Sequence, residues 1–342
     1  MVRNPNSHEA RAGSNQLLTN LGQTEYTLPN LKMRRIIPFA TVGQMGGLVP
    51  TFDSILKQRD IDDSRADGGS FAEIEDGYGS RPYKLKIAGT KYKLPMLRMG
   101  EAANVGIDWG RRATQVLMQA AQLKLEDEHC TVAGDPTNYE SGHTTALDAD
   151  TQFNSTSANK VDPAVTIAAA NSPVRDATGG DCNVIVMGAD VFDALKNSSF
   201  VRERLNPTVP NAVTEQMLAN LYDVPLVMKI DLANTAMAGK VLLARVHESV
   251  LQVALQGDGT QDFRGGYRIP FRASGAINRL MPSYGFTYVY DGQPRISNRM
   301  FNDENEYYYY KLSFNRSTEI VGVNEDNQKC IYGHLLTNVL GA

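Results

Sequence analysis

The sequence predicts an α+β fold that combines a long β excursion, one long helix and a mixed α/β region. Three observations predict it: residues 51–101 contain alternating apolar and polar positions, a single amphipathic stretch covers about 108–132, and from about 166 short apolar strands alternate with helical segments. The chain has 342 residues, of which 42% are hydrophobic and 21% charged, as in ordinary globular proteins. A chain of this length is expected to hold two packed regions or one domain with large excursions.

Composition argues against several classes of protein. The formal net charge of −4 lacks the basic signal of a protein that grips nucleic acid directly, so any DNA nearby is expected to be enclosed and not read. Cys130, Cys182 and Cys330 have no paired spacing, as expected for reduced thiols in a cytoplasm. Residues 1–20 are polar, and no stretch approaches the ~18 apolar residues that a membrane span needs. We therefore expect no membrane association.

Residues 1–40 are expected to form an N-terminal arm. The segment is rich in Asn, Ser, Gly and Gln, its leucines follow no clean period, and five basic residues outnumber two acidic ones. An extended arm needs a surface to lie on. A frayed terminus is the alternative on composition alone.

Residues 51–101 separate charge sharply along the chain. Seven acidic residues and one base lie between positions 60 and 76, whereas six bases and no acid lie between 81 and 98. Such complementary blocks suit a partner that presents the same two blocks in trans. We expect contacts between subunits at Asp60, Asp62, Asp63, Asp67, Glu73, Glu75, Asp76, Arg81, Lys84, Lys86, Lys91, Lys93 and Arg98.

The basic block itself has the period of two that is typical of a hairpin. Tyr83, Leu85 and Ile87 alternate with lysines, and the pattern resumes after a turn expected at Ala88 and Gly89. An isolated hairpin is marginal in water, so one this long needs support from another surface. The alternative is a solvated hairpin whose lysines protect its edges from stray pairing.

The clearest helix covers about 108–132, and Asp108 is expected to cap its N-terminus. About 25 residues at ~1.5 Å each would span roughly 37 Å, which suits a strut lying across a sheet. A break is expected at Gly134-Asp135-Pro136. The apolar stripe is expected at Trp109, Ala113, Val116, Ala120 and Leu123, widened by Leu117 and Ala121.

The region 166–280 is expected to hold a mixed sheet with helices beside it. Residues 183–187 predict a buried strand that leads into a helix containing Val191 and Leu195. Residues 214–222 predict a second helix. Three further strands are expected at 225–230, 240–246 and 250–255.

The last section, 281–342, is rich in aromatic residues. Tyr284, Phe286, Tyr288 and Tyr290 occupy alternate positions, and a second aromatic strand begins at 307. Alternating aromatics give a strand one face of large contact area.

The sequence offers no recognisable catalytic, cofactor or metal site. The histidines are scattered at spacings that fit no zinc pattern, and no nucleophile elbow, P-loop or dinucleotide fingerprint occurs. A faint calcium-loop likeness from Asp60 lacks the turn glycine, and Phe71 stands where the bidentate acid belongs. Residues 258–262 fit a plain Gly/Asp turn better than a cation clip. We therefore expect a protein that is not an enzyme, with no cofactor and no metal.

The order of these parts resembles that of the major capsid proteins of tailed double-stranded DNA phages, whose fold is shared with herpesvirus capsid floors and encapsulins. Val186-Met187-Gly188-Ala189-Asp190-Val191-Phe192 looks like the strand-then-helix motif of the axial domain, and Tyr222-Asp223-Val224-Pro225 resembles the strand entry that follows it. The likeness covers nearly the whole chain, but its motifs are soft. The parts that it implies are the N-terminal arm (1–40), the peripheral domain (41–50 and 102–165) with its spine helix, the E-loop hairpin (51–101), the axial domain (166–280), and the return strands and C-terminal segment (281–342).

The resemblance implies hexamers and pentamers in an icosahedral shell that encloses double-stranded DNA, with E-loops overlapping neighbouring subunits. It also implies a portal, assembly in the host bacterial cytoplasm, and in some cases a decoration protein. Some relatives carry a helical scaffolding segment ahead of the arm; this sequence shows none, which implies a separate scaffolding protein or a trimmed chain. Some relatives also form a Lys–Asn cross-link, for which the basic strand holds candidate lysines.

Two other classes remain open from the sequence. An encapsulin-like compartment shares the fold but encloses a protein cargo. A soluble α/β enzyme or ligand-binding protein with a β insertion would need a concave pocket with convergent polar groups.

Overall fold

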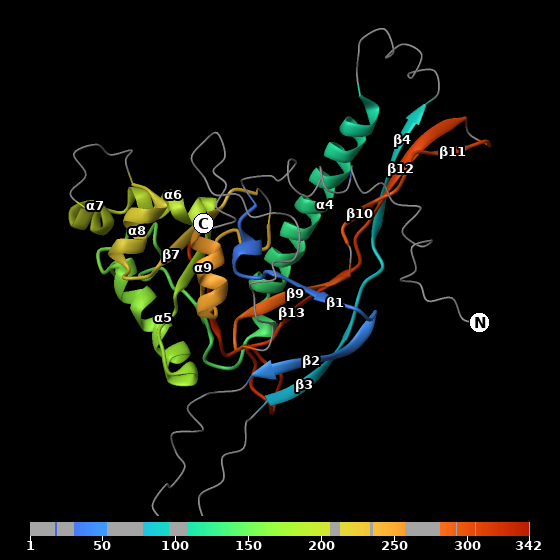
Figure 1. The fold of residues 1–342 in the computed structure, drawn as a ribbon. Helices are drawn as coiled ribbons and strands as arrows, with labels where there is room; N and C mark the ends of the chain where they lie inside the picture. Colours follow the sequence, from blue (N-terminus) through green and yellow to red (C-terminus); the bar gives the residue numbers. More distant parts are fainter. Residues whose placement is uncertain are drawn as a thin grey trace, which may run out of the picture.

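The computed structural model has two regions that share a hydrophobic core (Figure 1). One region is a five-stranded sheet with helices, and the other is a long helix with smaller sheets beside it. Among the described residues, no helix is long and apolar enough to cross a bilayer. The structure describes residue 18 and residues 31–52, 78–95, 108–205, 213–232, 235–256, 281–291, 293–304 and 306–341.

The five-stranded sheet has the strand order β5-β14-β8-β6-β7. β6 pairs in parallel with β7 and antiparallel with β8, whereas β14 pairs in parallel with β5 and antiparallel with β8. Its strands are β5 (Thr144–Ala146), β6 (Val184–Gly188), β7 (Leu226–Ile230), β8 (Val241–Ala244) and β14 (Gly333–Thr337). The helices of this region are α5 (Pro163–Thr178), α6 (Ala189–Asn197), α7 (Ser199–Leu205), α8 (Glu215–Leu221) and α9 (Glu248–Gln256).

β6 is buried on both faces, as its continuous apolar sequence predicts. Ile185 and Met187 pack in a cluster with residues of α5 and α6. Val184 and Val186 point into a second cluster, which continues into the other region of the molecule. The predicted strand at 183–187, the following helix, the helix near 214–222 and the strand near 225–230 are confirmed.

The strand expected at 250–255 is wrong, because the segment forms helix α9. Val250 and Ala254, four residues apart, are the buried side chains, whereas Gln252 and Leu255 are exposed. This is the period of a helix and not of a strand. A short apolar run does not by itself separate the two periods.

The long helix α4 (Trp109–Gly134) has 26 residues, and the Asp108 side chain accepts hydrogen bonds from the backbone N–H groups of Gly110 and Arg111, as predicted. It ends before Asp135 and the 3-10 turn η3 (Pro136–Asn138). The expected apolar stripe is partly wrong, because Ala120 and Leu123 are exposed. The buried face instead runs through Ala113, Leu117, Ala121, Leu125, His129 and Ala133 and their neighbours Thr114, Met118, Gln122, Glu126 and Cys130.

Two small sheets accompany α4. The first has the order β1-β9-β13, in which β9 pairs in parallel with β1 and antiparallel with β13. The second has β12 between β4 on one side and β10 and β11 on the other, and it runs beside α4 in Figure 1. The strands are β1 (Phe39–Val42), β9 (Gly285–Tyr290), β13 (Arg316–Ile320), β4 (Gly89–Pro95), β10 (Arg295–Ile296), β11 (Met300–Asn302) and β12 (Tyr307–Ser313).

The predicted aromatic strands are confirmed as β9 and β12. Five of the six residues of β9 are buried, so both of its faces lie in the interior. Tyr288 stacks on Tyr83 at 5.5 Å between ring centroids, which ties β9 to the neighbouring β2 and β3 ribbon.

β2 (Gly46–Phe52) and β3 (Tyr78–Lys84) pair antiparallel and form a two-stranded ribbon. The turn expected at Ala88 and Gly89 is wrong: in the described part of the chain β3 pairs with β2, and β4 pairs along its full length with β12. The chain between them bridges to β13, where the backbone N–H of Lys86 donates to the Arg316 carbonyl. The support that a long hairpin needs is thus provided by a strand more than 200 residues away.

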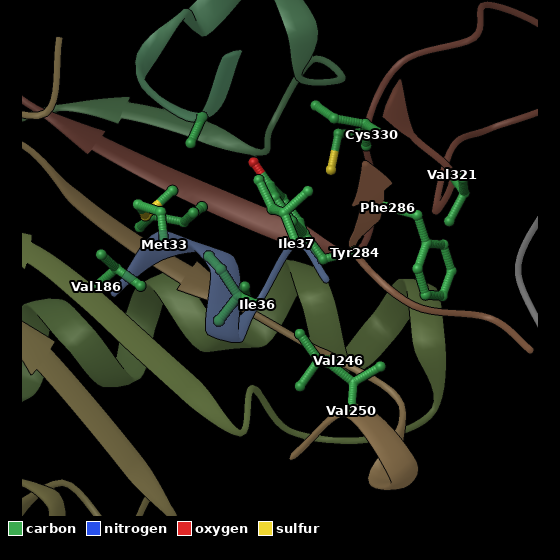
Figure 2. Packing of buried hydrophobic residues seen from close by; sticks show 14 of the residues in the cluster. Met33, Ile36, Ile37, Val186, Val246, Val250, Tyr284, Phe286, Val321 and Cys330 are labelled. Atoms are coloured by element: carbon green, nitrogen blue, oxygen red, sulfur yellow. The ribbon is translucent and has the colours of Figure 1, made fainter. Parts of the chain in front are cut away.

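The segment after 281 is divided between the two regions. β9 to β13 accompany α4, whereas β14 lies between β5 and β8 in the five-stranded sheet. Figure 2 shows the core where the regions meet: Met33, Ile36 and Ile37 lie in one cluster with Tyr284 and Phe286 of the aromatic segment, with Val246 and with Val250 of α9. Met33 belongs to the 3-10 turn η1 (Met33–Arg35).

Candidate assembly surface

The sheet formed by β4 and β12 has one buried face and one cationic face. Across the pair, Tyr308 lies opposite Leu94 and Tyr310 opposite Tyr92, and Leu94, Tyr310 and Leu312 are buried. Tyr310 and Leu312 pack in one cluster with Ala113, Leu117 and Met118 of α4. Residues at alternate positions face the other way, so Lys91 pairs with Lys311 and Lys93 with Tyr309 on the opposite face.

On this second face, which we call the lysine–tyrosine face (Lys91, Lys93, Tyr307, Tyr309 and Lys311), the ammonium groups lie over tyrosine rings. Lys91 Nζ is 4.2 Å from the Tyr309 ring centroid and donates a hydrogen bond of 2.8 Å to the Tyr307 hydroxyl. Lys93 Nζ is 5.2 Å from the Tyr307 centroid, and Lys311 Nζ is 5.2 Å from that of Tyr309. Each such contact at an exposed site contributes about 0.5–1 kcal/mol. The three lysines are exposed, so these contacts orient the cations without neutralising them.

The β11–β12 end of the sheet carries a second cation over an aromatic ring. The Arg299 guanidinium lies 4.8 Å from the Tyr308 ring centroid, and Phe301 contacts the same ring at 4.8 Å between centroids. Phe301 is 42% exposed. A partly exposed aromatic beside an oriented arginine is typical of protein interfaces.

The other described members of the expected contact set lie apart from this face. Arg81 is half-buried in β3 and Lys84 is exposed at its end. Lys86 lies 3.7 Å from Glu128 of α4, a carboxylate that also accepts from Arg316 Nε at 2.8 Å. Lys86 therefore has an anionic partner inside its own subunit. Asp60, Asp62, Asp63, Asp67, Glu73, Glu75, Asp76 and Arg98 lie outside the described residues.

Sequence reasoning missed three of the five residues of the lysine–tyrosine face. Lys311, Tyr307 and Tyr309 come from a segment 216 or more residues after Lys91 along the chain, and only the pairing of β4 with β12 brings them together. The available signal was the alternation within 307–311, which places Tyr307, Tyr309 and Lys311 on one side of a strand.

Large apolar side chains are also exposed on β2 and in the link between β3 and β4. Leu48 on β2 is 67% exposed, and Ile87, between β3 and β4, is 82% exposed. Exposed apolar side chains of this size suit a surface that is covered by another chain.

The described histidines have structural partners. His143 Nδ1 lies 3.0 Å from the Gly333 carbonyl and His334 Nε2 lies 3.0 Å from the Thr145 hydroxyl. Burial lowers the pKa of His143 and lowers that of His334 to about 4, so both rings are neutral at pH 7. No group of three or more His, Cys, Asp or Glu side chains that could hold a metal occurs in the described ranges.

The three cysteines are buried and unpaired. Burial raises the pKa of the Cys182 and Cys330 thiols to about 12, so neither is a thiolate at neutral pH.

No protein-family model matches the chain. A major capsid protein of Burkholderia phage BcepMu is 23% identical over 312 residues, which cover 89% of this chain and 90% of that protein. The crystal structure of a phage-related protein from Bordetella bronchiseptica RB50 superposes with a TM-score of 0.69 at 20% identity, covering 95% of this chain and 97% of the other. The capsid subunit of a native GTA particle superposes with a TM-score of 0.56 at 12% identity over 91% and 90% of the two chains.

These likenesses extend over nearly the whole chain. The mixed α+β fold is that of tailed-phage capsid subunits, so the fold inferred from the order of the segments is confirmed.

Proposed function

We propose that this chain is a structural major capsid protein, not an enzyme, that assembles into hexamers and pentamers of an icosahedral phage head around double-stranded DNA. The observation that carries the proposal is the capsid fold over nearly the whole chain, together with full-length similarity to a phage major capsid protein. An encapsulin-like compartment is the alternative, because it would use the same fold around a protein cargo.

We further propose that the lysine–tyrosine face receives the acidic block of a neighbouring subunit. Its exposed lysines are held in position by tyrosine rings, and positions 60–76 carry seven acids. Exposed ion pairs contribute only about 0.2–1 kcal/mol each. Charge therefore sets register and partner choice, while apolar area, including that of Leu48 and Ile87, supplies the stability of the contact.

The same proposal assigns the parts of the chain and its partners. Residues 1–40 act as the arm, 41–50 and 102–165 as the peripheral domain, 51–101 as the E-loop, 166–280 as the axial domain and 281–342 as return strands, although β14 completes the axial sheet. A separate scaffolding protein, a portal and in some particles a decoration protein accompany the subunit. Assembly takes place in the host bacterial cytoplasm, and the mature protein resides in the virion.

Electron microscopy of the expressed protein, combined with the nucleic acid content of the particles, tests the proposal. Closed shells that protect double-stranded DNA from nuclease, formed with the scaffolding and portal proteins present, support a phage head. Shells that contain protein cargo and no DNA support the encapsulin-like alternative. A protein that stays monomeric both alone and with the scaffolding and portal proteins present contradicts the shell assignment.

A charge-swap experiment tests the docking surface. The combined variant K91E, K93E and K311E should fail to assemble, because the reversed face repels the acidic block. A second set of changes, E73K, E75K and D76K, should restore assembly when combined with the first. K124E reverses an exposed lysine on α4 and serves as the control. Normal assembly of the triple variant, or no rescue by the second set, argues against charge pairing at this face.

A further inference from the structure

Residues 32–35 meet α4 at one buried carboxylate. Glu126 is 2% exposed, and its Oε1 accepts hydrogen bonds from the backbone N–H groups of Lys32 at 2.9 Å and Met33 at 3.0 Å. Its Oε2 lies 3.2 Å from the same Met33 nitrogen. The carboxylate thus satisfies the first N–H groups of η1, which have no partner within the turn. Removing the turn would expose the carboxylate to water.

The turn is also tied to the five-stranded region. Lys32 Nζ contacts Glu215 of α8 at 2.5 Å and Asp231, which follows β7, at 3.8 Å. Met33 is fully buried in the core that Figure 2 shows. Residues 32–35 therefore bridge α4 and the edge of the five-stranded sheet.

The charged and titratable groups around Glu126 come from each element packed here. Arg34 and Lys32 of the arm attract its negative charge, and Cys130 lies one turn further along α4. Burial lowers the pKa of Arg34 to about 10, so the guanidinium stays charged at neutral pH. Also present are Arg35 next to Arg34, Asp127 and His129 on α4, and Glu215 and Asp231, which contact Lys32.

We propose that residues 32–35 and Glu126 form a proton-linked clasp, in which the arm docks on α4 more tightly in mild acid than in mild alkali. Docking removes the carboxylate of Glu126 from water, which disfavours its charged form, and its direct hydrogen-bond partners are two neutral N–H groups. Docking therefore takes up a proton as the pH falls toward the value at which the docked carboxyl titrates.

The direction and pH window follow from the titration of Glu126. Burial raises its pKa from 4.5 to about 7, against the opposing effects of the two N–H groups and of Arg34 and Lys32. An undocked carboxyl exposed to water would titrate near its ordinary value. The proton-linked part of docking is then fully present below about pH 4.5 and is lost as the pH rises through about 7.

The described part of residues 1–40 contacts α4 at two places. Leu18 lies near Gly110 at the beginning of α4, whereas Lys32 and Met33 bind Glu126, sixteen residues after Gly110 along the same helix. At ~1.5 Å per residue, these two anchors are separated by roughly 24 Å along the helix. The clasp is thus a second contact with α4, and this inference is independent of the proposed charge docking.

Hydrogen exchange of the full chain, kept unassembled at low concentration, tests the clasp. The measured quantity is the protection of the backbone amides of residues 32–37, corrected for intrinsic exchange, between pH 5.5 and 8.5. In the wild type, protection should fall by up to about 30-fold between pH 5.5 and pH 8.5, since each pH unit between 5.5 and about 7 changes the docking equilibrium by up to tenfold. E126Q keeps an acceptor oxygen but cannot titrate in this range, so its protection should not vary with pH.

The matched control is D127N, which removes the same charge from the neighbouring, exposed position of α4. The protection of residues 32–37 in D127N should fall as the pH rises, as in the wild type. Protection in the wild type that does not change with pH overturns the clasp. An E126Q variant whose protection depends on pH as strongly as that of D127N also overturns it. Because no assembled particle is measured, failure of the clasp is separate from failure of the proposed shell function.

Discussion

At the scale of single residues, burial shifts the pKa of titratable side chains and so determines which of them are charged in the folded protein. His129 is fully buried on α4, and its Nε2 lies 2.7 Å from the Thr287 hydroxyl of β9. Burial, with the nearby positive charges of Arg316 and Arg34, lowers the pKa of His129 to about 3. The folded protein therefore keeps this ring neutral, whereas the unfolded chain protonates it near 6.5.

The sign of this shift predicts acid destabilisation. The contribution of His129 to stability is fully present above pH 6.5 and is lost as the pH falls toward 3, by up to about 1.4 kcal/mol per pH unit. Urea denaturation at pH 6.5 and pH 5 should show H129Q losing less stability than the wild type over this interval. An unchanged pH dependence in H129Q would contradict the assignment of a neutral buried ring.

The close approach of two backbones at the end of α4 makes a second prediction at this scale. A Cβ atom at Gly134 would lie 2.5 Å from the backbone oxygen of Ala236, which no side-chain motion can relieve. G134A should lower the free energy of unfolding by about 1–3 kcal/mol, as overpacking does. G43A is the control, since a Cβ there meets no atom within 4 Å. Denaturant titration measures both, and equal stabilities would show that the two backbones do not meet as described.

At the scale of elements, the sequence predicts local structure where the pattern is long or its ends are marked. α4 was predicted with its cap and its break because Asp108 and Pro136 mark its ends. β6 and β9 were predicted because their apolar and aromatic runs leave few alternatives. The interpretation of 250–255 failed because six residues contain too few periods to separate a helix from a strand.

The partners of a strand are harder to predict than the strand itself. The alternation around 83–94 was recognised, but a turn was placed at Ala88 and Gly89 because nearby strands commonly pair. The structure instead pairs β4 with β12, and the Gly89 position lies close to the Leu312 carbonyl, where a Cβ would come within 2.9 Å. Long-range pairing of this kind depends on the packing of α4 against both strands, which local sequence does not reveal.

The corrected face of α4 is testable. Leu117 is 3% exposed and packs against β12, whereas Leu123 is 41% exposed. L117A should cost about 2–5 kcal/mol of stability, as for a buried leucine. L123A should change stability by no more than about 0.5 kcal/mol. The comparison by denaturant titration separates the observed face from the stripe expected from sequence, for which L123A would be costly as well as L117A.

At the scale of the whole molecule, α4 is the helix against which distant segments of the chain pack. The arm, β4 and β12 all contact α4, and the core around Met33 joins them to the five-stranded sheet. Two of the five residues of the lysine–tyrosine face are predictable from sequence: Lys91 and Lys93 were identified, but Lys311 and the two tyrosines required the tertiary pairing. Lys86, also identified, is engaged with Glu128 in its own subunit.

The central claim is that this subunit assembles with other copies of itself. Sedimentation velocity of the purified wild-type chain over a wide range of concentration tests this claim most directly. The account predicts a concentration-dependent shift from subunits to large, discrete assemblies, because the lysine–tyrosine face, Leu48 and Ile87 are left exposed in the single chain. A single monomer peak at the highest concentration, with no assembly on addition of a scaffolding protein, would contradict it.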